Sequence, residues 1–162
     1  MNHEFNSSQN FKLGNLISVF LNQNRDCQPM EILMPYARLT LGADVSLPSP
    51  EDTASQLTDL IASELEKRYE LTSVSIENLQ SPIWTVGGRV RGATAHLDIY
   101  VTSGTNSVEQ KRRFVSKVME YLRSQISDLP EATYIVIHEV PGKNWGYDGQ
   151  TQADRRAISF GL

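Results

Sequence analysis

Apolar and polar residues alternate over residues 35–42, which is the two-residue period of a strand with one buried face. A helix is predicted to follow, because Ser49 offers a capping hydroxyl, Pro50 stands at the first helical position, and acidic residues occupy the first turn. Its apolar residues recur at helical spacing, so the charged residues 66–68 near its end are expected to face solvent. Residues 73–79 are then predicted to form a second strand.

The same order of elements is predicted further along the chain. Residues 95–103 alternate in the same way as the first strand. Ser107 and Gln110 have the spacing of a capping box, and apolar residues at helical spacing follow them as far as Pro130. Residues 132–140 are rich in β-branched residues and are predicted to form the fourth strand.

An aromatic residue followed by glycines closes each of these two segments. Trp84 and Trp145 lie 61 positions apart (145 − 84), and the β-branched runs at 72–79 and 133–140 are separated by the same offset. A repeat of this length is a supersecondary unit and not a local coincidence. The chain is therefore predicted to contain two copies of one fold.

Two strand–helix–strand units in tandem predict an α+β fold. A connection of this length between two strands is nearly always a right-handed crossover that joins parallel strands. Units at residues 34–88 and 95–149 therefore predict one four-stranded sheet with two helices on one face. The other face would carry a mixture of residues that includes Arg38 and Asp98, which are expected to pair across the sheet. We expect this second face to pack against other subunits.

Composition narrows the classes of function. The 162 residues suit one domain with a core, and a net charge of −4 with dispersed basic residues argues against a nucleic-acid partner. The single cysteine, Cys27, allows no intramolecular disulfide, and with three histidines it offers no metal-ligand spacing. Neither a metal nor another cofactor is expected, and a cytoplasmic location fits. No apolar run reaches the ~18 to 20 residues that a membrane-spanning helix needs, and the start of the chain lacks the features of a secretory signal.

Residues 1–33 stand outside the repeat and are rich in Asn, Gln and Ser. Within them, residues 11–21 have the spacing of a short amphipathic helix. Lys12 is the only cation near this stretch, so binding to a membrane surface is not expected. We interpret the segment either as a docked or disordered arm or as an extension absent from the mature chain, and residues 150–162 as a C-terminal tail.

Three short sequences carry a resemblance to a known family. They are Met34-Pro35-Tyr36, the segment 71–74, and the segment 137–149 with its tryptophan and glycines. Together with the doubled unit, these sequences make residues 34–149 similar to the tautomerase superfamily. The fused, double form of the chain resembles the 4-oxalocrotonate tautomerase and malonate semialdehyde decarboxylase branches of that superfamily. The resemblance implies a tautomerase/MIF-like fold, a homotrimer, and a small carboxylate or enol substrate.

The resemblance also implies that Pro35 is the catalytic base, because members of the family use a proline that is the first residue of the mature chain. Such a proline has a secondary amine, whereas inside a chain its nitrogen is an amide that cannot accept a proton. Two alternatives remain open. Either translation starts at Met34 or the arm is cut away, so that Pro35 becomes the first residue, or the extension is real and Pro35 merely begins a strand.

The arginines that hold carboxylates in several branches of the family are missing at the matching positions. The loop 103–107 contains no cation, and neither does the middle of either second strand. Other arginines could hold the carboxylate instead. We predict that Arg89 and Arg91, in the glycine-rich connection between the units, bind substrate. Candidates outside that pair are Arg38, Arg155 and Arg156.

The second tryptophan motif supplies the remaining candidates. The resemblance implies that Trp145 shapes a dry pocket for substrate, and Tyr147 is predicted to donate a hydrogen bond to a developing enolate oxygen. His138 and Glu139 are neighbours on a strand and would point to opposite faces, so we interpret them as structural.

Two hypotheses follow for the function. The first is a tautomerase-like isomerase that transfers a proton on a small 2-hydroxy-dienoate or enolpyruvate-like acid, with decarboxylation as a sister chemistry. The second is a non-catalytic oligomeric binding or scaffold protein of the same fold.

Overall fold

The structure is a computed structural model that describes residues 34–80 and 83–159. The arm predicted for residues 1–33, with its amphipathic stretch, lies outside the described residues. No helix in the described part of the chain is both long and apolar enough to cross a membrane.

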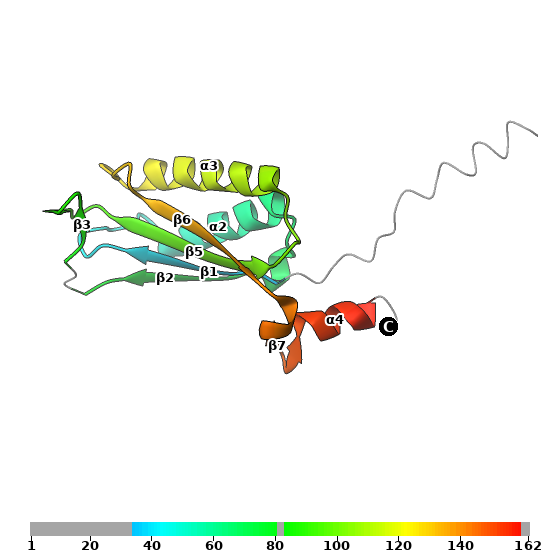
Figure 1. Cartoon of the computed structure of the whole chain (residues 1–162). Coiled ribbons are helices and arrows are strands. Elements are labelled where there is room, and N and C mark those ends of the chain that lie inside the picture. The colour runs from blue at the N-terminus through cyan, green and yellow to red at the C-terminus, as the bar shows by residue number, and fades with distance from the viewer. Residues whose placement is uncertain (1–33, 81–82, 160–162) are drawn as a thin grey trace, which may run out of the picture. The chain divides into compact units, whose positions relative to one another are not determined.

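Four strands form one mixed sheet (Figure 1). They are β1 (Tyr36–Leu41), β2 (Ser73–Asn78), β5 (Ala95–Thr102) and β6 (Tyr134–Val140), in the order β2-β1-β5-β6. β1 pairs with β2 in parallel, β5 pairs with β6 in parallel, and the two units meet where β1 and β5 run antiparallel. The four predicted strands and the α+β class are confirmed.

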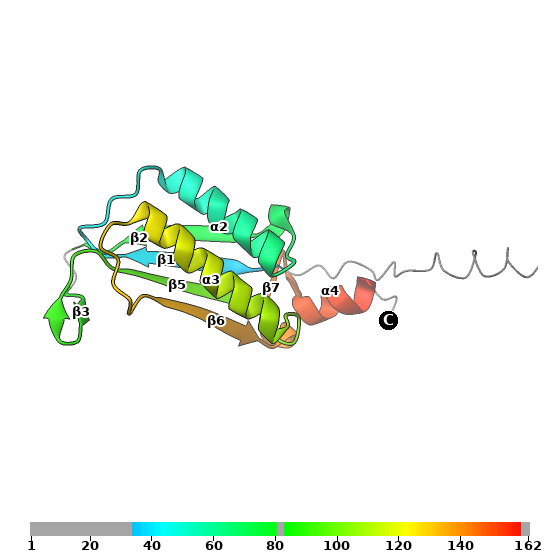
Figure 2. The same cartoon turned by 90° about the horizontal axis from the view of Figure 1, so that it is seen from above.

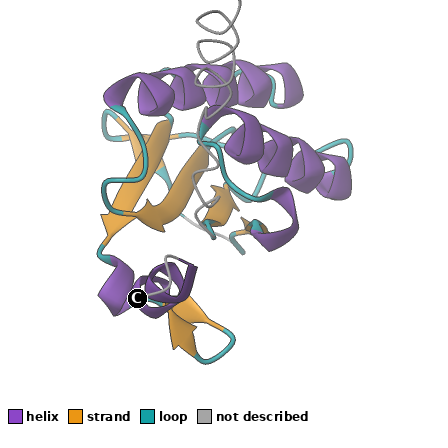
Figure 3. Cartoon of the chain, turned by 90° about the vertical axis from the view of Figure 1, so that its right-hand side faces the viewer, coloured by secondary structure: helices purple, strands orange, loops and turns teal. Residues whose placement is uncertain are grey.

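Two helices, α2 (Pro50–Glu64) and α3 (Val108–Gln125), cover one face of this sheet and leave the other without a helix (Figures 2 and 3). Both begin where their caps predict. The Ser49 hydroxyl accepts a hydrogen bond from the Asp52 backbone N–H (3.1 Å), and Ser107 and Gln110 complete both halves of the capping box. Alternate residues of β1 and β5 and one stripe of each helix are buried between the layers, where Phe114 is the largest fully buried side chain.

The two units have approximately the same structure, and equivalent residues can be identified from their burial and their hydrogen bonds. Ala37 and Leu39 on β1 are buried in the same way as Leu97 and Ile99 on β5. The Arg91 backbone N–H donates to the Trp84 carbonyl (2.9 Å), and 61 positions later Gln152 donates to Trp145 in the same way (3.0 Å). The repeat predicted from the sequence is therefore a structural one.

Each unit ends in a short hairpin that the sequence did not predict. β3 (Thr85–Val86) pairs with β4 (Arg89–Val90), and β7 (Gly146–Tyr147) pairs with β8 (Gln150–Thr151). Both residues of each turn have positive φ, namely 59° and 73° at Gly87 and Gly88, and 49° and 75° at Asp148 and Gly149. This is the conformation that tight hairpins require, and it explains the glycines after each tryptophan.

A further helix, α4 (Gln152–Ser159), lies in the stretch that the sequence analysis interpreted as a C-terminal tail. The two hairpins lie at opposite ends of the sheet, and α4 continues from β8 beside the short helix η2 (Gly142–Asn144) (Figure 1).

One prediction about the first helix is wrong. α2 ends at Glu64, Glu66 takes a left-handed φ of 53°, and the chain then turns into the short helix η1 (Tyr69–Leu71). Because the helical phase stops there, Lys67 is buried instead of facing solvent, and its Nζ donates to the Thr105 hydroxyl (3.1 Å).

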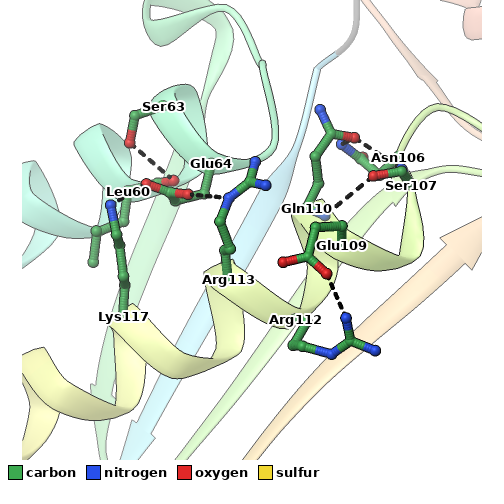
Figure 4. Close-up of polar contacts among 10 residues, drawn as sticks. All are labelled: Leu60, Ser63, Glu64, Asn106, Ser107, Glu109, Gln110, Arg112, Arg113 and Lys117. Atoms are coloured by element: carbon green, nitrogen blue, oxygen red, sulfur yellow. Dashed lines mark hydrogen bonds and ion pairs between the residues drawn. The ribbon is translucent and has the colours of Figure 1, made fainter.

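A buried carboxylate joins the two helices. Glu64 accepts hydrogen bonds from Lys117 Nζ (2.5 Å) and Arg113 Nε (3.2 Å) on α3 (Figure 4). The Lys117 bond is the largest cause of a lowered pKa of Glu64, with burial acting in the opposite direction.

Candidate active site

Pro35 lies immediately before β1 and is buried. Its carbonyl accepts a hydrogen bond from the Ser73 backbone N–H (3.2 Å), which begins the ladder with β2. Tyr36 is opposite Tyr100 on the antiparallel strand, so continuing this register by one residue places Pro35 opposite Val101, which is 1% exposed. Pro35 is therefore at the sheet end where β5 and β6 finish.

The second hairpin and α4 lie at this same end of the sheet (Figure 1). Residues 143–151 line a pocket of about 500 Å³ along the hairpin, and Trp145 and Tyr147 are both half-buried in it. The fold thus brings three of the predicted site residues, Pro35, Trp145 and Tyr147, to one end of the sheet.

Arg155 on α4 is a cation in direct contact with Tyr147. Its guanidinium carbon lies 3.8 Å from the centroid of the Tyr147 ring, and Nη2 donates to the Tyr147 carbonyl (3.1 Å) and to Asp148 Oδ2 (3.4 Å). Its Nε is buried and has no hydrogen-bond partner among the described residues. The sequence indicated Arg155 only as a substitute, because the helix that carries it was not predicted.

Arg89 and Arg91 are placed elsewhere by the structure. Both are exposed on or beside the first hairpin, at the sheet end opposite Pro35. Arg91 lines a separate pocket of about 550 Å³ together with Asp128 and Glu131. Within one chain, therefore, these two arginines do not meet Pro35, Trp145 and Tyr147.

Buried polar atoms without partners gather next to the second hairpin. They are Thr102 Oγ1, Trp145 Nε1 and both amide atoms of Gln152, each lacking a hydrogen bond in the described part of the chain. A Cβ added at Gly142 would be 3.5 Å from the Thr102 side chain and 3.6 Å from Gln152, so these two side chains flank the same glycine. Unpaired buried groups cost about 1–3 kcal/mol each, and such groups occur at sites that take up water or ligand.

The positions at which the resemblance implies arginines have structural roles here. In the loop 103–107, Asn106 Nδ2 donates to the Leu65 carbonyl (2.8 Å) and ties the loop to the end of α2. Ser75, in the middle of β2, shares a hydrogen bond with the Tyr36 hydroxyl (3.1 Å). Neither position presents a cation to the sheet.

A carboxylate organises the helix-free face of the sheet. Asp98 Oδ2 accepts from Arg38 Nη2 (3.3 Å), which confirms the predicted pair. Asp98 Oδ1 is 2.7 Å from Nε2 of His138 and 3.2 Å from Nε2 of His96. Burial raises the pKa of Asp98, but the hydrogen bonds from His138, His96 and Arg38 more than offset it, so the pKa lies below its usual range.

The neighbours His138 and Glu139 point to opposite faces, as predicted. The His138 ring stacks on Tyr100, with 4.5 Å between centroids, whereas Glu139 pairs with Lys111 of α3 (2.9 Å) on the helix side. Although His96, Asp98 and His138 converge, no group of His, Cys, Asp or Glu side chains within the described residues is arranged to hold a metal ion.

Comparison with known proteins agrees with this geometry. The family model for tautomerase enzymes matches residues 96–155, which is the second unit with its hairpin and the first part of α4. Over 60 residues the chain is 30% identical to the probable tautomerase K2 of Dickeya dadantii (strain 3937), a match that covers 37% of this chain and 90% of that protein. The chain belongs to the tautomerase family.

Solved tautomerase-fold structures cover both units of the chain. A native fused 4-OT matches with a TM-score of 0.64 and 22% identity, over 74% of this chain and 97% of that one. The macrophage migration inhibitory factor-like protein of Entamoeba histolytica matches with a TM-score of 0.61 and 20% identity, over 73% and 98% of the two chains. These structures share the fold of about three quarters of this chain, and they support the fused double unit.

Proposed function

We propose that this tautomerase-family chain is an isomerase that transfers a proton between carbon and oxygen of a small 2-hydroxy-dienoate or enolpyruvate-like acid. The observation that supports it is the position of Pro35, which is buried at the sheet end that also carries Trp145 and Tyr147. The proposal requires that Pro35 be the first residue of the working chain, because only then is its nitrogen an amine.

The chemistry assigns one step to each group. A buried Pro35 amine favours its neutral form and accepts the proton from the enol hydroxyl or from carbon. The Tyr147 hydroxyl donates a hydrogen bond to the oxygen on which negative charge develops, and Trp145 keeps water away from the reacting atoms. Pro35 then returns the proton at the other position, so the reaction is an isomerisation without a cofactor.

The substrate carboxylate needs a cation, and Arg155 supplies one beside Tyr147. A guanidinium presents paired N–H donors to a planar carboxylate. Arg89 and Arg91 join such a site only when a neighbouring subunit brings its first hairpin to it. A homotrimer built across the helix-free face is part of the proposal, and related fused 4-OT structures are described as trimers.

The test is ketonisation of phenylenolpyruvate by protein that begins at Pro35. We expect catalysis, and we expect Pro35→Ala at the same first position to lower kcat/KM at least tenfold, because the secondary amine is replaced by a primary one. A melting temperature close to that of the parent protein is the control for folding. Equal activity of the two proteins, or none in either, would contradict the proposal and leave the scaffold hypothesis.

A further inference from the structure

Buried polar atoms gather at the junction between the end of β5, η2 and α4. They are the Thr102 hydroxyl, the Trp145 indole N–H and both amide atoms of Gln152, and none has a hydrogen bond among the described residues. Gln152 is 3% exposed and Thr102 is 8% exposed, so both side chains are more than nine-tenths buried inside one chain. A second subunit on the helix-free face cannot pair these atoms, because the chain that carries them already encloses them.

Gln152 occupies a position where an apolar side chain would be more stable. Its amide has lost its hydrogen bonds to water and makes none to the described residues in exchange. A folded chain rarely keeps several such groups next to one another without a further role. We therefore interpret the cluster of Thr102, Trp145 and Gln152 as groups that act on a molecule from outside the chain.

The hairpin and α4 place this cluster beside Arg155. Trp145 has extended backbone and lies two positions before Tyr147, so the two rings lie on the same side of the hairpin. Gln152 and Arg155 are three positions apart on α4 and share one helix face, with about 5–6 Å between their Cβ atoms. The Gln152 backbone N–H donates to the Trp145 carbonyl (3.0 Å). Arg155 in turn contacts the Tyr147 ring. A cation and an amide therefore lie side by side at the spacing of a small acid.

The chemistry of the cluster favours an uncharged group. The Gln152 amide and the Thr102 hydroxyl can each donate and accept a hydrogen bond, whereas the Trp145 N–H only donates. All three side chains are neutral. A carboxylate buried among them would lose its hydration without gaining a counter-ion, which is strongly unfavourable. An amide or hydroxyl group would instead find both donors and acceptors.

We propose that Thr102, Trp145 and Gln152 form a neutral hydrogen-bonding subsite. It selects small acids that carry an amide or a hydroxyl at the end away from the carboxylate, and it rejects acids with a second carboxylate. Arg155 holds the carboxylate, an assignment that rests on the proposed function. The subsite itself does not depend on the amine of Pro35.

The ligand enters along the pocket of residues 143–151, whose wall includes Trp145. Because the cluster is closed in the empty protein, α4 must part from the hairpin to admit the neutral group. Among the described residues, none of α4 belongs to the hydrophobic core, so little apolar contact opposes this movement. Once bound, the ligand supplies the hydrogen bonds that the cluster lacks.

The test compares three planar acids of similar size, fumaramate, fumarate and crotonate, whose far groups are an amide, a carboxylate and a methyl. Binding to the full 162-residue chain is followed by NMR. The chain has two tryptophans, so Trp84, the equivalent residue of the first unit, is an internal control for Trp145. We expect fumaramate to bind at least tenfold more tightly than fumarate and to move the Trp145 indole N–H resonance downfield, while the Trp84 resonance stays in place.

Gln152→Met retains the size of the side chain and removes its hydrogen bonds. We expect its preference for fumaramate over fumarate to fall to within about twofold, with unchanged affinity for crotonate. Its melting temperature should stay the same or rise, because an unpaired buried amide is replaced by an apolar group. Gln56→Met changes an exposed glutamine on α2 and is the matched control, which should keep the parent's preference.

The proposal is overturned if fumarate binds as tightly as fumaramate, if none of the acids moves the Trp145 resonance, or if Gln152→Met keeps the preference. A lower melting temperature with an unchanged preference would make Gln152 a purely structural residue. These measurements use a chain in which the nitrogen of Pro35 is an amide, so they do not test proton transfer. Failure of ketonisation by protein that begins at Pro35 bears only on the proposed function, and the two failures are therefore distinguishable.

Discussion

At the scale of single residues, Asp98 links the two units of the fold. Its carboxylate receives hydrogen bonds from side chains on three strands, namely Arg38 on β1, His96 on its own strand β5, and His138 on β6. These contacts lower the pKa of Asp98 even though burial acts against them. Ionised Asp98 therefore stabilises the folded sheet relative to the unfolded chain.

The sign of this linkage predicts an acid-side effect. A carboxylate with a lowered folded-state pKa contributes its full stability above its unfolded value, about pH 4, and loses that contribution as the pH falls through the folded-state pKa. We expect Asp98→Asn to lower the free energy of unfolding by about 1–3 kcal/mol at pH 7, and to flatten the loss of stability below about pH 4. Urea unfolding measured from pH 7 to pH 3 checks this. An unchanged slope below pH 4 in the variant would contradict it.

The candidate residues differ in how far the sequence could reveal them. Pro35, Trp145 and Tyr147 were found from short motifs because a strand start and a hairpin carry local signatures. His96 and Asp98 lie two positions apart on a strand, so their shared face could have been read from the sequence. Arg38 and His138 lie on other strands, so their contacts with Asp98 depend on the register between the strands. For His138, no sequence pattern fixes that register.

At the scale of elements, the hairpins decide where the site residues point. β7 and β8 have two residues each, and Gly146 faces Gln150 and Thr151 across the ladder so closely that an added Cβ would overlap the Gln150 carbonyl oxygen. At Gly149 nothing lies within 4 Å of an added Cβ, and only its φ of 75° opposes substitution. A side chain at Gly146 is therefore opposed by a steric overlap, whereas one at Gly149 is opposed only by the backbone conformation.

We expect Gly146→Ala to open the second hairpin and displace Tyr147 from Arg155, because the overlap is with backbone and cannot be relieved by a side-chain rotation. Activity of protein that begins at Pro35 should fall at least tenfold, while the melting temperature changes by only a few degrees, since the hairpin lies outside the buried core. Gly149→Ala is the matched variant and should cost about 1–2 kcal/mol at most in hairpin stability. Similar kinetics for both variants would show that the hairpin does not position the site.

The long elements were predictable, whereas the short ones were not. Caps and periodicity are local signals, so α2, α3 and the four strands of the sheet agree with the sequence prediction within a few residues. A strand of two residues has no period to detect, and α4 follows such a strand directly. Lys67 was assigned to the wrong environment because the left-handed turn at Glu66 ends the helical phase, and a glutamate does not signal that conformation.

At the scale of the whole molecule, the two units share a fold but differ in the side chains at the two ends of the sheet. One sheet end offers a proline with Trp145 and Tyr147, and the other offers His96 with Trp84. The helix-free face between them carries half-buried Tyr36, Tyr100 and His138, stacked in a row with 5.9 Å and 4.5 Å between successive centroids. A homotrimer that covers this face is the assembly that the proposal requires.

Native mass spectrometry of the protein purified from its own cells is the most direct test of whether Pro35 can act as a base, because one spectrum gives both the first residue of each chain and the number of chains. We expect a complex of three chains, each with the mass of a polypeptide that begins at Pro35. Chains whose mass includes the residues before Pro35 would contradict it, because the nitrogen of Pro35 would then be an amide in the working protein.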